Sequence, residues 1–179
     1  KKKMFLQSKL SWNVVLSSEK LETEGLKLQK AIITHLLSVF AAKKASKDHG
    51  YLLAVTTVDR IGEGRVRQHS GEVLFPVEFS CVAFRMATGE ILEGTVHKIL
   101  KHGVFMRCGP VENVYLTHQK MKDYEYVPGE NPYFMNAKSS RIERGGVVRF
   151  LVMGVKFVEN EKEFQAVASL DGDYLGPLS

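Results

Sequence analysis

The segment that decides the fold runs from residue 90 to residue 109 and reads EILEGTVHKILKHGVFMRCG. Its glycines fall where a small barrel needs them, because Gly94 suits a strand that must bend and Gly103 suits a tight turn between strands. After Gly103 the polarity alternates with period two, as it does along a strand. The segment therefore predicts a strand over residues 90–100, a turn, and a second strand over residues 103–108.

The second of these strands predicts an exposed binding surface. If Val104, Met106 and Cys108 face the core, alternation places Phe105 and Arg107 together on the outside. Single-stranded nucleic-acid binding uses an aromatic ring on which a base stacks, worth roughly 1–3 kcal/mol per base, beside a cation for the backbone. We interpret this face as a candidate site for single-stranded nucleic acid.

Three further apolar segments complete the second half of the chain. Period-two patterns predict strands over residues 113–117, 147–158 and 163–170, and five short strands make a small barrel. Residues 120–146 form a long insertion between the third and fourth strands. Loops of this length tend to be functional or to pack on a partner.

The first half has a different organisation. Strands are predicted over residues 4–16, 51–58 and 73–84, and a helix over residues 23–44. The helix carries apolar residues at every fourth position, namely Leu28, Ile32, Leu36 and Phe40. We therefore predict an α+β domain over residues 1–85 and a β-barrel domain over residues 86–179.

The loop between the last two strands of the first half reads IGEGRV over residues 61–66. A dinucleotide-binding loop needs a third glycine and a following helix, and here a strand follows. Two interpretations stay open, a plain connection between strands and an exposed docking loop. In either case Gly62 and Gly64 are expected to permit backbone geometries denied to other residues.

Composition excludes several classes of protein. The net charge of +5 comes entirely from residues 1–81, since residues 82–179 hold 12 Lys and Arg against 12 Asp and Glu. Cys81 and Cys108 form no CxxC pair and the histidines form no HExxH motif, so we expect free thiols, no metal site and no cofactor. The sequence contains neither a membrane-length apolar run nor a signal peptide, which favours an intracellular protein.

The spaced glycines 94, 103 and 109, with Val96, Ile99 and Phe105, resemble the RNA-binding OB-fold first described in a ribosomal protein of the small subunit. The resemblance covers residues 90–170. Where that family has a second exposed aromatic residue this chain has His102, and Leu116 stands near the family's exposed histidine. Alternation predicts that Tyr115 takes the place of that histidine.

The whole chain resembles the seventh-subunit, or stalk, family of eukaryotic RNA polymerases and its archaeal counterpart. The matching phrases are Gly50-Tyr51, Gly62-Glu-Gly64-Arg65, Gly129-Glu130-Asn131-Pro132 and Asp173-Tyr174-Leu175-Gly176. Residues 25–47 and 128–135 look most similar to the versions in plant polymerases IV and V, which serve RNA-directed silencing. The resemblance implies a truncated ribonucleoprotein-like tip domain followed by an OB-fold barrel.

The resemblance implies a nuclear, non-catalytic subunit that forms a heterodimer with a small helical stalk subunit. Its tip domain would dock on the polymerase core near the clamp through Ile61, Gly62, Glu63, Gly64 and Arg65. The barrel would contact emerging single-stranded RNA through Lys98, Lys101, His102, Phe105, Arg107 and Tyr115. The alternative is a free-standing single-stranded RNA-binding protein. An enzyme is disfavoured, because Asp171 and Asp173 lack a third metal ligand.

Overall fold

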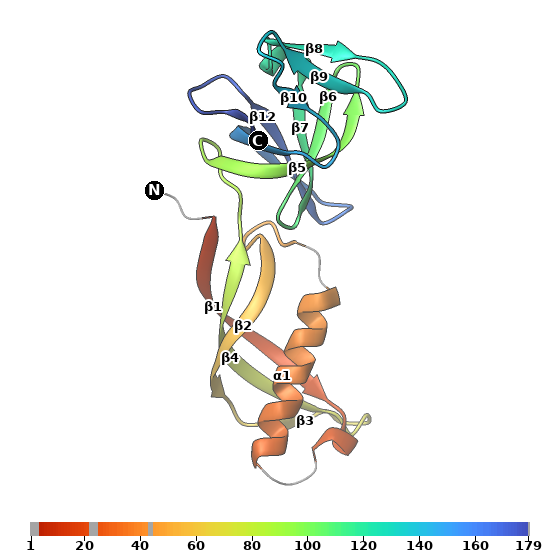
Figure 1. Ribbon diagram of the computed structural model, residues 1–179. Helices are drawn as coiled ribbons and strands as arrows, with labels where there is room; N and C mark the ends of the chain where they lie inside the picture. Colours follow the sequence, from red (N-terminus) through yellow and green to blue (C-terminus); the bar gives the residue numbers. More distant parts are fainter. Residues whose placement is uncertain (1–3, 22–24, 43–44, 179) are drawn as a thin grey trace. The chain divides into compact units, whose positions relative to one another are not determined.

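The computed structural model describes residues 4–21, 25–42 and 45–178, and the chain divides into two compact units (Figure 1). The sheet–helix unit comprises Phe5–Arg85. The barrel unit is built mainly from Met86–Ser179. Each unit has its own core and is described by itself below.

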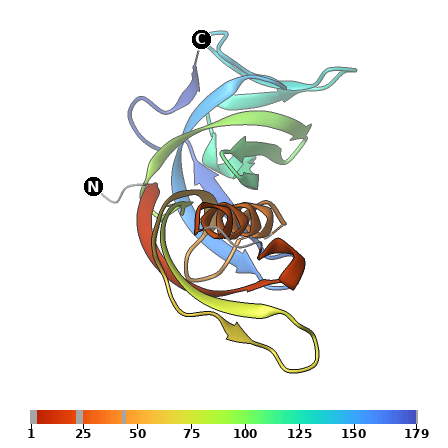
Figure 2. The same cartoon turned by 90° about the horizontal axis from the view of Figure 1, so that it is seen from below.

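The sheet–helix unit is an antiparallel sheet with one helix on one face. Its strands are β1 (Phe5–Leu16), β4 (Val73–Phe84) and β2 (Tyr51–Ile61), in that order, and the two-residue β3 (Arg65–Val66) also pairs with β4. The helix α1 covers Gly25–Ala42, and the ends of the predicted helix at residues 23–24 and 43–44 lie outside the described residues. Figure 2 shows the strands curving past one side of α1.

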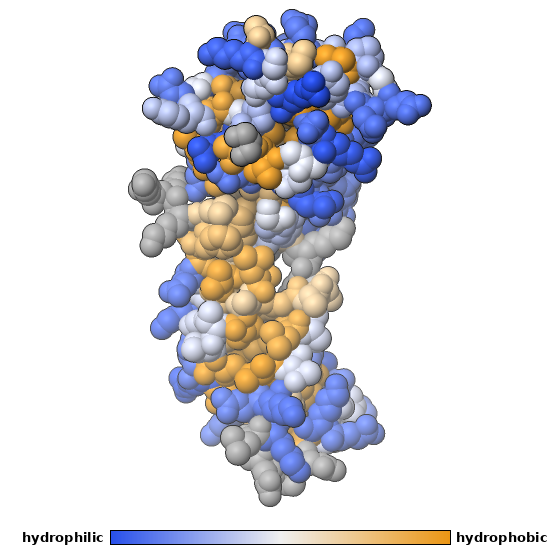
Figure 3. Space-filling view, viewed as in Figure 1, coloured by the Kyte–Doolittle hydropathy of each residue, from blue (hydrophilic) through white to orange (hydrophobic). Residues whose placement is uncertain are grey.

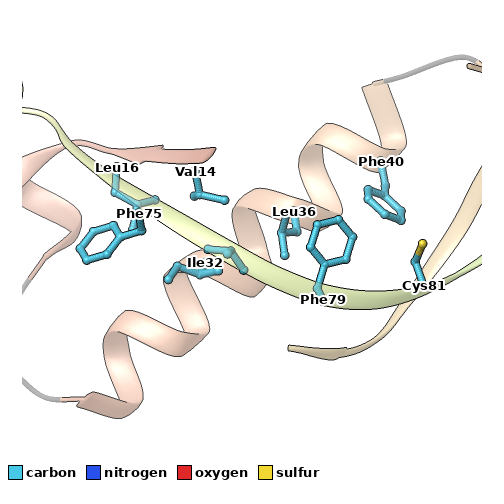
Figure 4. Packing of buried hydrophobic residues seen from close by; sticks show 9 residues of the cluster. Val14, Leu16, Ile32, Leu36, Phe40, Phe75, Phe79 and Cys81 are labelled. Atoms are coloured by element: carbon cyan, nitrogen blue, oxygen red, sulfur yellow. The ribbon is translucent and has the colours of Figure 1, made fainter. Parts of the chain in front are cut away.

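The predicted apolar stripe of α1 forms one side of the core. Ile32 and Leu36 are fully buried and Phe40 nearly so, and they pack against residues of β1 and β4 (Figure 4). The β4 members of this core cluster are Phe75, Val77, Phe79 and Cys81, which alternate along the strand. Each fully buried large apolar side chain contributes roughly 1.5–3 kcal/mol, so this single layer stabilises the unit.

Strand β2 departs from simple alternation. Its pairing with β4 contains three register shifts, so that extra residues bulge out of the ladder. As a result Leu52, Val55, Val58 and Ile61 pack against the core at intervals of three residues. The bulged Leu53 remains 44% exposed.

The barrel unit has five main strands that close on themselves. They are β5 (Ile91–Leu100), β6 (Gly103–Cys108), β7 (Val111–Thr117), β11 (Val147–Val158) and β12 (Glu163–Ser169). β5, β6 and β7 form an antiparallel meander, β7 pairs with β12 in parallel, and β11 pairs with both β12 and β5. This connectivity is that of the OB-fold, and the predicted α+β fold class with an OB barrel is confirmed.

The long insertion is folded. It contains β8 (Tyr124–Val127), β9 (Tyr133–Asn136) and β10 (Arg141–Ile142), which form a small antiparallel sheet. Its residues Phe134 and Ile142 are buried, so the insertion has an apolar inner face. A short 3-10 helix, His118–Lys120, precedes it, and the C-terminal β13 (Gly176–Leu178) pairs with β11. Strands of two to four residues are too short to reveal their period in a sequence.

Candidate nucleic-acid interface

Strand β6 has the two faces that alternation predicts. Val104, Met106 and Cys108 are at most 4% exposed, while Phe105 is half-buried and Arg107 is exposed. Phe105 and Arg107 therefore stand on the outside of the barrel.

Phe105 has an aromatic neighbour on the next strand. The register of β6 and β7 places Phe105 directly opposite Tyr115, and their ring centroids are 4.9 Å apart. The Tyr115 hydroxyl donates a hydrogen bond to the His102 carbonyl oxygen at 3.1 Å, and the two rings of this pair lie 6.1 Å apart. Leu116 is completely buried. Tyr115 thus occupies the outward position beside Phe105, as alternation predicted.

A β-bulge brings a further ring and a cation to this face. The pairing of β5 with β6 shifts between Val96 and Lys98, so His97 is the extra residue. Val96 faces the core, and the bulge allows Lys98 to point outward opposite Phe105. The His97 ring lies 6.4 Å from that of Phe105. Sequence reasoning did not include His97 in the site, although alternation from the buried Val96 places it on the outside.

The predicted cations of this face differ in availability. Arg107 Nε donates to Glu112 Oε2 at 2.7 Å, and both side chains are about half exposed. This pairing offsets the charge of Arg107, which is one of the predicted RNA contacts. Lys98 and Lys101 are exposed, and neither forms an ion pair with another described residue. They are the more available cations.

The aromatic pair continues into a groove of about 740 Å³ on the outside of the barrel. In register across four strands, a cross-strand row of outward positions runs from Phe105 through Tyr115 and Val167 to Gly154. All four residues line the groove. A second hollow of about 520 Å³ lies beyond the Phe105 end of the row. His97 and Lys98 of β5 contribute to its walls. Neither hollow was predicted from the sequence.

The candidate docking residues 61–65 lie together at one end of the sheet, and Phe84 lies at the other end. The Gly62 amide donates to the Pro76 carbonyl oxygen at 2.7 Å, and Glu63, Gly64 and Arg65 are exposed. Neither glycine has a positive φ, which corrects the expectation of special backbone geometry. They are needed for close approach instead, since a Cβ on Gly62 would stand 2.7 Å from Pro76 Cγ, and one on Gly64 2.6 Å from Phe75 Cε1.

Both cysteines of the chain are buried free thiols. Burial, together with the nearby Glu90 carboxylate, raises the pKa of the Cys108 thiol to about 11, so the thiol keeps its proton at neutral pH. Among the described residues there is no cluster of three His, Cys, Asp or Glu side chains placed to hold a metal ion. No helix in the described part of the chain is both long enough and apolar enough to cross a membrane.

Comparison with known proteins gives several relatives. No protein-family model matches the chain. It is 60% identical over 176 residues to DNA-directed RNA polymerase V subunit 7 of Arabidopsis thaliana, covering 98% of this chain and 99% of that protein. It is 50% identical over 175 residues to RNA polymerase IV subunit 7 of the same plant, covering 98% and 100%. It is 33% identical over 132 residues to RNA polymerase II subunit RPB7 of Glycine max, covering 73% and 74%.

Proposed function

Because the chain belongs to the family of seventh subunits of DNA-directed RNA polymerases and is of the polymerase IV and V type, we propose that it is the non-catalytic stalk subunit of a nuclear polymerase that acts in RNA-directed silencing. The observation that carries this proposal is the 60% identity over 98% of the chain, which includes both units. A chain with both units has a surface for docking on the polymerase and a barrel for contact with RNA.

The docking loop, residues 61–65, is the proposed contact with the polymerase core. Its neighbour β3 pairs with β4, and the Arg67 amide donates to the Glu72 carbonyl oxygen at 2.8 Å, so the loop has a hydrogen-bonded base. From this base project the exposed Glu63 and Arg65 and the 72%-exposed Val66. A preorganised loop loses little conformational entropy on binding, which favours such a contact.

The apolar surface of the sheet–helix unit is the proposed contact with a small helical stalk subunit. Figure 3 shows hydrophobic residues gathered over this unit, and its exposed large apolar side chains include Phe5, Leu6, Leu37 and Leu53. Leu37 is half exposed on α1, outside the buried stripe. Extended exposed apolar surface is typical of protein interfaces, and a partner helix would remove it from water.

The outer face of the barrel is the proposed contact with emerging RNA. Phe105 and Tyr115 offer adjacent rings for base stacking, and Lys98 and Lys101 offer charges for the backbone. Residues 82–179, which include the barrel domain, have no net charge, so we expect modest affinity for RNA in isolation and a marked dependence on salt.

Affinity purification from plant nuclei tests the proposal. The tagged chain is expected to recover a small stalk subunit and the largest subunit of polymerase IV or V. Replacing residues 61–65 by a Ser-rich linker should reduce recovery of the largest subunit and leave that of the small subunit intact. The same replacement in the exposed β11–β12 turn, residues 159–162, is the matched control.

Three results would contradict parts of this proposal. Recovery of the polymerase II largest subunit would refute the assignment to polymerases IV and V. Equal recovery of the core by the linker variant and the wild type would refute docking through the loop. Recovery of no polymerase subunit would favour the free-standing RNA-binding protein.

A further inference from the structure

The groove beside Phe105 and Tyr115 has a polar edge as well as an apolar floor. Two residues along each strand from the cross-strand row, Asn113 on β7 pairs in register with Gln165 on β12, which in turn pairs with Lys156 on β11. All three residues line the groove. Adjacent strands lie about 4.8 Å apart, so the two side-chain amides begin from neighbouring points on the sheet.

The absence of a side chain at Gly154 keeps the far end of the groove open. A bulge in β11 shifts the register between Val152 and Gly154, and brings Gly154 opposite the 48%-exposed Val167. A Cβ at Gly154 would meet Val167 Cγ2 at 3.4 Å, an ordinary contact. The backbone at Gly154 does not have a positive φ either. The position therefore tolerates a side chain, and a side chain there would fill the groove.

The groove offers the chemistry of a nucleobase site. A base has two apolar faces and a polar edge, and the groove has an aromatic and aliphatic floor beside two neutral amides. Each amide carries donors and an acceptor, and among the described residues neither makes an intrachain hydrogen bond. No carboxylate lines the groove, and Lys156 adds a positive charge at its edge. Exposed base edges of single-stranded RNA are read by hydrogen bonds of this kind.

We propose that this groove binds a nucleobase of single-stranded RNA, with the base on the apolar row and its edge read by Asn113 and Gln165. The inference rests on the proposed contact between the barrel and RNA, and adds a base preference to it. Asn and Gln form paired hydrogen bonds with the N6 and N7 positions of adenine, so the preferred base is adenine. A purine also covers more of the ring surface than a pyrimidine.

The test is a titration of the full-length chain, together with its small partner, with labelled single-stranded oligo(A) and oligo(U). The wild type should bind oligo(A) about 10-fold more tightly than oligo(U). Replacing both amides, in Asn113→Ala/Gln165→Ala, should remove this preference while leaving affinity for oligo(U) within about 2-fold. Gln119→Ala, which removes an exposed amide outside the groove, should change neither affinity.

A second pair of variants tests the groove without removing any contact group. Gly154→Val, and the smaller Gly154→Ala, should weaken binding of both RNAs in the order of side-chain volume, with thermal melting showing that each variant is folded. Unchanged binding by a folded Gly154→Val chain overturns the inference. A preference for adenine that survives loss of both amides overturns it as well.

The failure of this inference can be told apart from the failure of the proposed function. If the wild type binds RNA and Phe105→Ala weakens binding, but the groove variants do not, the RNA face stands and the nucleobase site is refuted. If the wild type binds neither RNA, the RNA face and the nucleobase site are both refuted. If Gly154→Val instead releases a polymerase subunit during purification, the groove is a protein interface.

Discussion

The ion pair between Arg107 and Glu112 is predicted to weaken the binding of RNA to the barrel. Glu112→Gln removes the carboxylate that engages Arg107 Nε at 2.7 Å, and so frees the guanidinium beside Phe105. We expect the variant to bind single-stranded RNA more tightly than the wild type at low salt. Arg107→Ala should weaken binding less than Lys98→Ala, because Lys98 has no ion-pair partner among the described residues.

The magnitude follows from counterion release. Each phosphate contact to a single strand adds about 0.7 to the slope of log affinity against log salt concentration. One additional contact therefore makes affinity fall by a further factor of about 2.6 between roughly 50 and 200 mM salt. The pair itself is about half exposed and contributes at most about 1 kcal/mol, so the melting temperature should change little.

The assay is a titration of labelled single-stranded RNA at several salt concentrations, with Glu93→Gln as the matched control. Glu93 forms a similar 2.7 Å pair with Arg149 on the neighbouring strands β5 and β11, away from the cross-strand row. The control makes the same change in net charge and frees another arginine. An unchanged slope for Glu112→Gln refutes the reasoning, and an equal effect of Glu93→Gln shows that bulk charge is responsible.

Three other predictions concern stability, thiol chemistry and assembly. Leu36→Ala removes a fully buried side chain and should lower the free energy of unfolding by roughly 2–5 kcal/mol, whereas Leu37→Ala at its half-exposed neighbour should change it by about 0.5 kcal/mol or less, measured by denaturant unfolding. Because burial raises the Cys108 pKa from 9.0 to about 11, the folded chain retains a proton that the unfolded chain releases, so stability should fall as pH rises through this range; a Cys108→Ala variant with the same pH profile would contradict this. Expressed alone, the chain should aggregate through the apolar surface of its sheet–helix unit, and co-expression with the small stalk subunit should make it monodisperse in size-exclusion chromatography; a stable monomer at high concentration would count against the proposed interface.

Periodicity in the sequence was sufficient to predict the main elements. The spacing of Ile32, Leu36 and Phe40 predicted the buried stripe of α1, and the alternation in β6 predicted which of its side chains are buried. Both succeed because burial of apolar area is the dominant force in folding, and a helix or strand turns that requirement into a fixed spacing. The short strands of residues 120–146 escaped prediction, because two to four residues contain too few repeats.

The candidate site could be predicted only in part. Phe105 and Tyr115 were predicted to face outward, and the structure places them opposite each other. Lys98 faces outward because of a bulge, which the sequence did not indicate. The pairing of Arg107 with Glu112 was also missed, because it depends on a register shift between β6 and β7.

The sequence by itself determined the fold class, the family and the inward or outward direction of the regular strand residues. These depend on local spacing and on motifs that can be read along the chain. Only the tertiary structure decided that Asn113 and Gln165, which lie 52 positions apart, stand side by side on a groove kept open by Gly154. That neighbourhood follows from the closure of the barrel, in which β12 joins β7 in parallel. Closure is a cooperative property of five strands, and no single strand carries a signal for it.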